Sequence, residues 1–309
     1  MEYRALGSTG LQVSLLSYGA SPLGGVFRDI DHKEGIRTVH AALDLDVNFI
    51  DVSPYYGLTK AEAVLGQALK GIPRDKYLLA TKVGRYGEAE FDFSPARVAR
   101  SLDDSLQRLG LDYVDLIQCH DIEFVPLQPL IDHTLPALRR LQAAGKARFV
   151  GVTGLPLRAL RTVSEQAPLD TILSYCQFAL NNAALQADLP FYRQRGVGVI
   201  NASPLSMGLL TQRGAPPWHP ASPQLKAACH SAAQLCRAQG VDIAQLALQF
   251  ALSNPDIATT LVGTASPANI QQNIEWASQP LDPALLSQVQ AILQPVQGRT
   301  WTSGLAENS

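Results

Sequence analysis

The sequence predicts a (β/α)8 barrel, an α/β fold in which eight parallel strands close into a cylinder inside a ring of helices. Eight short segments of β-type composition alternate with helical segments almost from one end of the chain to the other. The connections between them are only a few residues long, which suits parallel strand–helix units. No G-x-G-x-x-G motif follows the first strand, which disfavours the main alternative, an open doubly wound sheet.

The predicted strands occupy residues 15–19, 48–51, 77–82, 113–120, 148–152, 171–175, 197–201 and 258–262. Helices are expected at residues 31–45, 60–70, 94–109, 127–144, 188–195 and 242–252. A short helix is expected to follow the fifth strand and end near residue 166, and another is expected to begin at residue 266. Asp31 and Glu34 have the spacing of a capping box, and Ser94-Pro95 places a capping hydroxyl before a first-turn proline. Gly145 suits the end of the helix before it.

Three segments lie outside the eight units. Residues 6–11 resemble a hairpin turn, which we expect to plug the floor of the barrel. Residues 280–293 predict an extra C-terminal helix. Residues 213–224 contain four prolines around Trp218-His219, so we predict an irregular loop near the barrel mouth. The whole chain, residues 1–309, is expected to form one barrel domain.

Composition disfavours several classes of function. The net charge is −2 and no run of Lys or Arg exceeds a pair, which is poor material for binding nucleic acid or an anionic membrane. No window approaches 18 consecutive apolar residues and the N-terminus lacks a signal-like stretch. The four cysteines, at positions 119, 176, 229 and 236, lack metal-site spacing and are expected to be free thiols in a reducing compartment. We therefore expect a cytoplasmic protein with no metal ion.

Polar residues at the predicted carboxyl ends of three neighbouring strands indicate a site. Asp51 ends the second strand, Lys82 ends the third and His120 follows the fourth, while Tyr56 lies in the loop after Asp51. In barrels of this type, side chains at the carboxyl ends of the strands face the active site. Each residue alone has a structural explanation, as a turn former, a packing residue or a solvated edge charge. Four of them on adjacent strand ends favour a functional interpretation.

The four residue types together suit proton transfer by a phenol. A free tyrosine has a pKa near 10, too high for ready proton exchange at neutral pH. We expect the ammonium of Lys82 to lower the pKa of Tyr56 and Asp51 to hold Lys82 in place. His120 is expected to contact the substrate oxygen and fix its orientation.

With these residues placed, the chain resembles the aldo-keto reductases over essentially its whole length. Residues 48–57 resemble the strand-two signature of that family, and Thr81-Lys82 and Gln118-Cys119-His120 resemble its Lys and His motifs. The resemblance implies an NAD(P)-dependent barrel oxidoreductase with Tyr56 as acid or base. It also implies a set of cofactor-binding residues: Ser21, Asp51, Thr153, Tyr175, Ser203, Leu205, Gly208, Gly263, Thr264, Asn269 and Asn273.

A narrower resemblance concerns the loops, which are similar to those of family members that oxidise L-galactose or L-fucose at C1 to the lactone. The similar segments are residues 19–24, 119–124, 201–210, 217–223 and 300–304. It implies a sugar substrate contacted by Tyr56 and His120, with Trp218 and Trp301 as candidate walls of the sugar site. The chain departs from the usual family pattern at three places, where it has Ala202, Thr153-Gly154 and Tyr175.

The expected cofactor is NAD. The 2′-phosphate of NADP normally requires an Arg or Lys near the adenosine ribose. In the family this charge comes from the segment after strand eight, here residues 263–273, which contain no basic residue. A cation from another loop is the alternative.

Two other functions stay open, an NADPH-dependent reductase of small aldehydes or ketones and a redox-sensing subunit with little turnover. The oligomeric state is not predicted.

Overall fold

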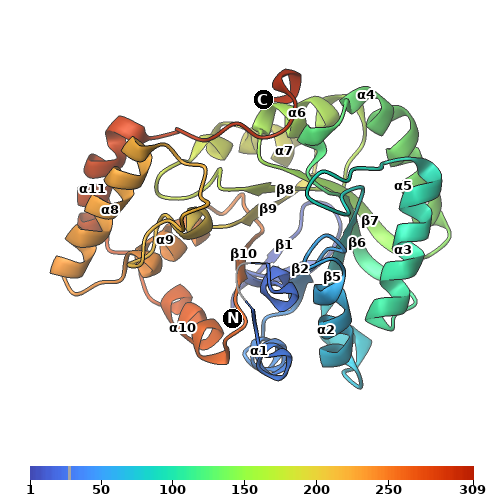
Figure 1. Ribbon diagram of the computed structural model, residues 1–309, viewed down its shortest axis with the longest axis horizontal. Helices are drawn as coiled ribbons and strands as arrows, with labels where there is room; N and C mark the ends of the chain where they lie inside the picture. The colour runs from blue at the N-terminus through green and yellow to red at the C-terminus, as the bar shows by residue number, and fades with distance from the viewer. Residues whose placement is uncertain (27–28) are drawn as a thin grey trace.

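The computed structural model describes residues 1–26 and 29–309 and contains the predicted barrel. Eight parallel strands close in the order β10-β3-β4-β5-β6-β7-β8-β9, surrounded by helices (Figure 1). They are β3 (Leu16–Gly19), β4 (Phe49–Asp51), β5 (Leu78–Val83), β6 (Val114–Cys119), β7 (Ala147–Gly154), β8 (Thr171–Tyr175), β9 (Gly198–Ala202) and β10 (Thr259–Gly263). Because β10 pairs with both β9 and β3, the sheet is closed and the doubly wound alternative is wrong.

The outer layer follows the predicted helices with small shifts at the ends. The helices at predicted positions are α1 (His32–Asp44), α2 (Lys60–Leu69), α3 (Pro95–Leu109), α5 (Leu135–Ala143), α6 (Leu157–Gln166), α7 (Leu189–Gln194), α9 (Ile243–Leu252) and α10 (Pro267–Ser278). The extra C-terminal helix is confirmed as α11 (Pro283–Leu293). Asp31 caps α1 by accepting from the backbone N–H of Lys33 at 2.9 Å, as its position predicts.

Two helical predictions need correction. The helix expected over residues 127–144 is broken into α4 (Leu127–Pro129), a π turn (Leu130–Thr134) and α5. Pro136 lacks the backbone N–H that the interior of a regular α-helix needs, and this interrupts the ladder. The irregular loop ends at Ser222, not at residue 224, because Pro223 opens an unpredicted helix, α8 (Pro223–Ala238). Ser222 caps α8 through the N–H of Leu225 at 3.2 Å.

The N-terminal hairpin closes the floor of the barrel, as expected. Strands β1 (Tyr3–Ala5) and β2 (Gln12–Ser14) pair antiparallel around the turn at residues 6–11. Leu6 is fully buried and packs in one apolar cluster with residues from six barrel strands: Phe49, Ala80, Leu116, Leu173, Ile200 and Leu261. The plug therefore fills the amino end of the barrel and leaves the carboxyl ends of the strands for a site.

A second apolar cluster packs α8 and α11 against each other and against α9, on the left in Figure 1. The C-terminal tail then crosses back over the molecule and is fixed by Asn308, whose Nδ2 donates to the carbonyl oxygens of Glu123 and Val125 at 3.0 and 2.9 Å. The four cysteines are buried and free, in agreement with the sequence.

We predict that Gly7→Ala destabilises the fold more than Gly10→Ala, and thermal or urea unfolding checks this. Both glycines have positive φ, +55° and +76°, which costs an L-residue about 1–2 kcal/mol. A methyl group on Gly10 meets open space, whereas on Gly7 it would lie 2.3 Å from the backbone nitrogen of Gly198. Overpacking adds roughly 1–3 kcal/mol. Equal losses of unfolding free energy would show that the hairpin does not seat tightly on the barrel floor.

Candidate active site

The four residues predicted from the strand ends lie together at the mouth of the barrel. Lys82, on β5, is 1% exposed and Asp51, at the end of β4, is 2% exposed. The ammonium of Lys82 forms an ion pair with Asp51 Oδ1 and donates to Tyr56 Oη at 3.1 Å and to the carbonyl oxygen of Val52 at 3.0 Å. An ammonium has three donors, so these contacts fully use Lys82 and fix its position.

Gln118, on β6, completes the surroundings of Asp51. Its side-chain Nε2 donates to Asp51 Oδ2 at 2.9 Å, while its Oε1 is buried without a partner in the described chain. Gln118 is not among the four residues predicted from the strand ends, although period-two alternation along the strand puts it on the same face as His120. Asp51 is thus held on both oxygens, which keeps it beside Lys82.

Tyr56 does not have the lowered pKa that we expected. Burial raises its pKa to about 12, and this effect outweighs the lowering by Lys82. The carboxylates of Asp51 and Asp121 raise it further. The expectation from sequence had the correct sign for Lys82 but ignored desolvation, which disfavours the phenolate. Tyr56 therefore rests as a neutral phenol at neutral pH.

His120 faces Tyr56 edge-on, with ring centroids 5.5 Å apart and planes at 90°. Burial, followed by the nearby charges of Lys82 and Arg85, holds the pKa of His120 well below its usual value. The ring is therefore neutral at neutral pH, with one nitrogen as donor and the other as acceptor.

Ser53, which the sequence analysis did not single out, indicates which nitrogen is the donor. Its Oγ lies 2.9 Å from His120 Nδ1 and already accepts from the backbone N–H of Tyr55 at 3.1 Å. Because Ser53 is fully buried and its acceptor role is met by the backbone, its hydroxyl proton is best donated to Nδ1. His120 then carries its hydrogen on Nε2. A serine two residues after a strand-end Asp was the available signal.

A second group of charges lies beside His120. Asp121 forms an ion pair with Arg85, and its Oδ2 lies 3.6 Å from His120 Nε2. The Arg85 guanidinium stacks on the ring of Tyr55 at 3.9 Å and donates to its hydroxyl at 3.1 Å. Sequence reasoning placed Asp121 after His120 but gave it no role, because its partner Arg85 comes from the separate loop after β5.

The residues implied as cofactor-binding lie on the strand ends and the elements that follow them. Ser21 opens a short turn after β3, Asp51 ends β4, Thr153 is in β7, Tyr175 ends β8, Ser203, Leu205 and Gly208 follow β9, Gly263 ends β10, Thr264 comes next, and Asn269 and Asn273 are on α10. Ser203 and Gly208 both have positive φ, 55° and 103°. The positive φ angles show that the turn after β9 has an irregular backbone conformation.

The start of α10 suits a phosphate group. Its N-cap residue Ser266 makes no side-chain hydrogen bond to the helix, and the first turn, all within the described chain, has no acidic residue. Pro267 has no backbone N–H, and Asn269 and Ile270 both donate theirs to the Ser266 carbonyl oxygen, at 3.1 and 3.2 Å. The positive end of the helix dipole is therefore the feature that favours an anion here. A dinucleotide phosphate at this terminus stays a prediction.

Two of the implied cofactor residues have their hydroxyls engaged by carboxylates. Thr153 Oγ1 accepts from the N–H of Asp121 at 3.0 Å and lies 3.4 Å from its Oδ1. Tyr175 donates to Glu123 Oε1 at 3.2 Å. Contact of either hydroxyl with a cofactor stays a prediction, and it would require these carboxylates to give up a partner.

Trp218 and Trp301 both contact the ring of His219. Trp218, 53% exposed, stacks on His219 at 5.9 Å, and Trp301 meets the same ring edge-on at 4.9 Å. The tail that carries Trp301 is tied to Glu123, whose Oε1 accepts from Ser303 at 3.0 Å. Burial, followed by the charge of Asp121, raises the pKa of Glu123 to about 7. A sugar-facing role for the tryptophans stays a prediction.

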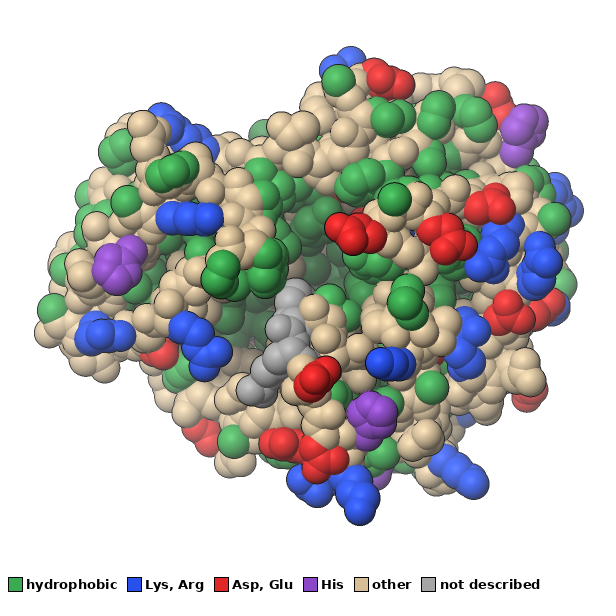
Figure 2. Space-filling model, in the orientation of Figure 1, with side chains coloured by type: hydrophobic (Ala, Val, Ile, Leu, Met, Phe, Trp, Pro, Cys, Tyr) green, Lys and Arg blue, Asp and Glu red, His purple; other side chains and the backbone are tan. Residues whose placement is uncertain are grey.

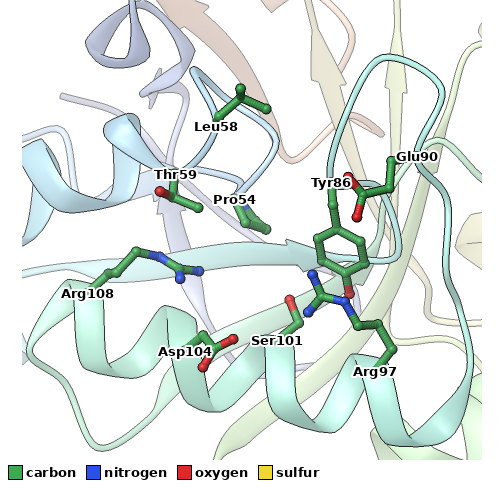
Figure 3. Close-up of a pocket in the computed structure, with 9 residues that line it drawn as sticks. All are labelled: Pro54, Leu58, Thr59, Tyr86, Glu90, Arg97, Ser101, Asp104 and Arg108. Carbon is green, nitrogen blue, oxygen red and sulfur yellow. The ribbon is translucent and has the colours of Figure 1, made fainter.

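The surface view shows a face hollowed near its centre and lined there by hydrophobic side chains (Figure 2). A separate pocket of about 210 Å³ lies between the loop after β4 and α3, outside the quartet (Figure 3). Its polar lining includes Arg97, Asp104 and Arg108.

Within residues 1–26 and 29–309, no helix is both long and apolar enough for a membrane span, and no cluster of acidic, His or Cys side chains could hold a metal ion.

Residues 15–294 match the aldo/keto reductase family, so the chain belongs to that family and is an oxidoreductase of the class that uses nicotinamide cofactors. It is 49% identical to an L-galactose dehydrogenase of Arabidopsis thaliana, over 100% of this chain and 99% of the relative. It is 29% identical to a D-threo-aldose 1-dehydrogenase of a Pseudomonas species, over 89% and 92% of the two chains.

A solved structure supports the same conclusion. An aldo-keto reductase from Bacillus halodurans in its holo form superposes with a TM-score of 0.80 at 26% identity, covering 98% of this chain and 99% of that one. The barrel, the hairpin and the family predicted from sequence are therefore confirmed.

We predict that Ser53→Ala shifts the tautomer of His120. Removing the hydroxyl leaves Nδ1 buried without its partner, which costs about 1–3 kcal/mol and is relieved by moving the hydrogen or the ring. The nitrogen chemical shifts of His120 in isotopically labelled protein measure the tautomer. Turnover should fall about 10–100-fold, because about 1.4 kcal/mol corresponds to a factor of ten. Unchanged shifts with native thermal stability would show that Ser53 does not set the tautomer.

Proposed function

We propose that this enzyme oxidises an aldose, L-galactose or L-fucose, at C1 to the aldonolactone with NAD as the hydride acceptor. The relative at 49% identity is an L-galactose dehydrogenase. Two more distant relatives are a D-threo-aldose 1-dehydrogenase and a D-arabinose 1-dehydrogenase of Saccharomyces cerevisiae, the latter 37% identical over 67% of this chain. All three names describe a dehydrogenase of a sugar, and two of them place the oxidation at C1.

One observation carries the chemistry: the 3.1 Å contact between Lys82 Nζ and Tyr56 Oη, in a site where Asp51 fixes the ammonium. The C1 hydroxyl of the sugar binds with its oxygen between Tyr56 Oη and His120 Nε2. As the phenolate, Tyr56 removes the hydroxyl proton, and Lys82 stabilises the negative charge that precedes transfer. A bound nicotinamide would supply the acceptor for the hydride, with its two electrons, that leaves C1.

His120 acts as a neutral donor. With its hydrogen on Nε2, it donates to the C1 oxygen and holds the sugar with C1 turned toward the cofactor site. A neutral imidazole is suited to this donor role because it neither gains nor loses a proton in the reaction, so that proton transfer is left to Tyr56.

The cofactor assignment depends on the segment after β10. Gly263, Thr264, Asn269 and Asn273 are proposed to hold the dinucleotide together with Ser203, Leu205, Gly208, Ser21, Thr153 and Tyr175. The uncapped start of α10 supports a pyrophosphate there. Because residues 263–273 include no Lys or Arg, the segment offers no cation for a 2′-phosphate, which favours NAD over NADP.

We predict that Tyr56→Phe lowers aldose oxidation by about 10²–10⁴-fold while NAD binding is retained, because only the proton-transferring oxygen is lost. The pKa of Tyr56 is raised, so the reactive phenolate is scarce at neutral pH and becomes more abundant as pH increases. The wild-type rate should therefore rise from about pH 7 to about pH 10, and the residual rate of the variant should be flat.

Tyr3→Phe, on the exposed hairpin, is the matched control and should behave as wild type. A deuterium isotope effect at C1 establishes that chemistry limits the rate. A flat wild-type profile under that condition would remove Tyr56 as the base.

We predict reduction of NAD by purified enzyme with L-galactose or L-fucose, followed by the absorbance of the reduced nicotinamide, and weaker turnover with NADP. D-galactose and D-arabinose run in parallel define the stereochemistry. Absence of turnover with every aldose and both cofactors, with reduction of small aldehydes by NADPH, would replace this proposal with the reductase alternative.

A further inference from the structure

Asp121 presents a carboxylate oxygen to the same space as His120. Its Oδ2 lies 3.6 Å from His120 Nε2, which is too far for a hydrogen bond. A third polar group at the mouth can therefore contact both atoms. Nε2 is the nitrogen that carries the hydrogen in the tautomer set by Ser53, so a substrate oxygen bound to it lies within reach of Asp121.

The carboxylate is held firmly in this place. Asp121 is only 5% exposed, is paired with Arg85 and contacts Thr153 through both its backbone N–H and Oδ1. Its φ of +52° is in the left-handed region, which persists in a non-glycine residue where the surroundings enforce it and is concentrated at functional sites. Arg85 is itself fixed, since its guanidinium packs on Tyr55, Phe91 and Phe124 at 3.9, 5.3 and 5.2 Å.

We propose that Asp121 Oδ2 accepts a hydrogen bond from the substrate hydroxyl next to the reacting carbon, which makes Asp121 a specificity-determining residue for α-hydroxy carbonyl compounds and aldoses. The inference rests on the proposed function, since it takes the reacting oxygen to lie on His120 Nε2. In an aldose the neighbouring group is the C2 hydroxyl. An ionised carboxylate is purely an acceptor, so it favours a substrate that carries a hydroxyl donor at that carbon.

The same arrangement discriminates against simple aldehydes and ketones. A substrate without the neighbouring hydroxyl would cover Asp121 with apolar atoms and remove water from the carboxylate without replacing its hydrogen bond. Sites built to hydrogen-bond a substrate hydroxyl reject analogues that lack it by large factors for this reason. The Asp121–Arg85 pair thus gives a physical basis for choosing sugars over plain carbonyl compounds.

The test compares substrates that differ by one hydroxyl, in the same enzyme preparation. We would measure kcat/KM for an aldose and its 2-deoxy analogue with NAD, and for glycolaldehyde and acetaldehyde in reduction. Wild type should prefer the hydroxyl-bearing member of each pair by about 100-fold or more. In Asp121→Asn the preference should fall at least about tenfold, because the acceptor loses its charge.

Asp121→Gly is the second variant, since glycine adopts the positive φ without strain and lacks the carboxylate entirely. Loss of active protein cancels in each ratio, so partial misfolding does not imitate the effect. Asp104→Asn, in the pocket outside the quartet (Figure 3), is the charge-matched control and should keep the wild-type ratios.

Unchanged preference in both Asp121 variants would overturn the inference. Failure of the proposed function is distinguishable, because wild type would then oxidise no aldose while the glycolaldehyde–acetaldehyde pair still reports on Asp121. A wild-type enzyme with no preference within either pair would also overturn it.

Discussion

The buried ion pair between Lys82 and Asp51 is the interaction on which the site depends. A lysine that is 1% exposed is tolerated only because Asp51, Tyr56 and the Val52 carbonyl accept all three of its hydrogens. Removing any one would leave a buried donor or charge unmatched. The pair also joins the carboxyl ends of β4 and β5, and the same ammonium contacts Tyr56 Oη and so fixes the position of the phenol.

The burial that makes this ion pair strong also works against ionisation of Tyr56. Low polarity around the phenol raises its pKa to about 12 in spite of the adjacent ammonium. Asp51 contributes to this result, because it neutralises much of the Lys82 field that would otherwise favour the phenolate. The resting site is therefore an ammonium–carboxylate pair with a neutral phenol, and Tyr56 must lose its proton before it can act as the base in oxidation.

The two rims of the barrel have different tasks. The hairpin and the apolar cluster around Leu6 seal the amino end, whereas buried charges gather at the carboxyl end. Beyond the quartet, the Arg85–Asp121 pair and Glu123 extend this polar region toward β7, β8 and the C-terminal tail. The tail reaches Glu123 from residues 180 or more positions later in the chain, so the wall of the mouth combines the middle of the chain with its C-terminal end.

The sequence by itself determined the barrel, the hairpin and the placement of Asp51, Tyr56, Lys82 and His120 at adjacent strand ends. These are local properties, because strand and helix periodicity and the residue that ends a strand can be read along the chain. The structure alone decided the pairing of Arg85 with Asp121, the Ser53 contact to His120, the π turn before α5 and the net direction of the Tyr56 pKa. Each of these depends on which distant side chains meet and how much water they exclude, and that information exists only once the barrel has closed.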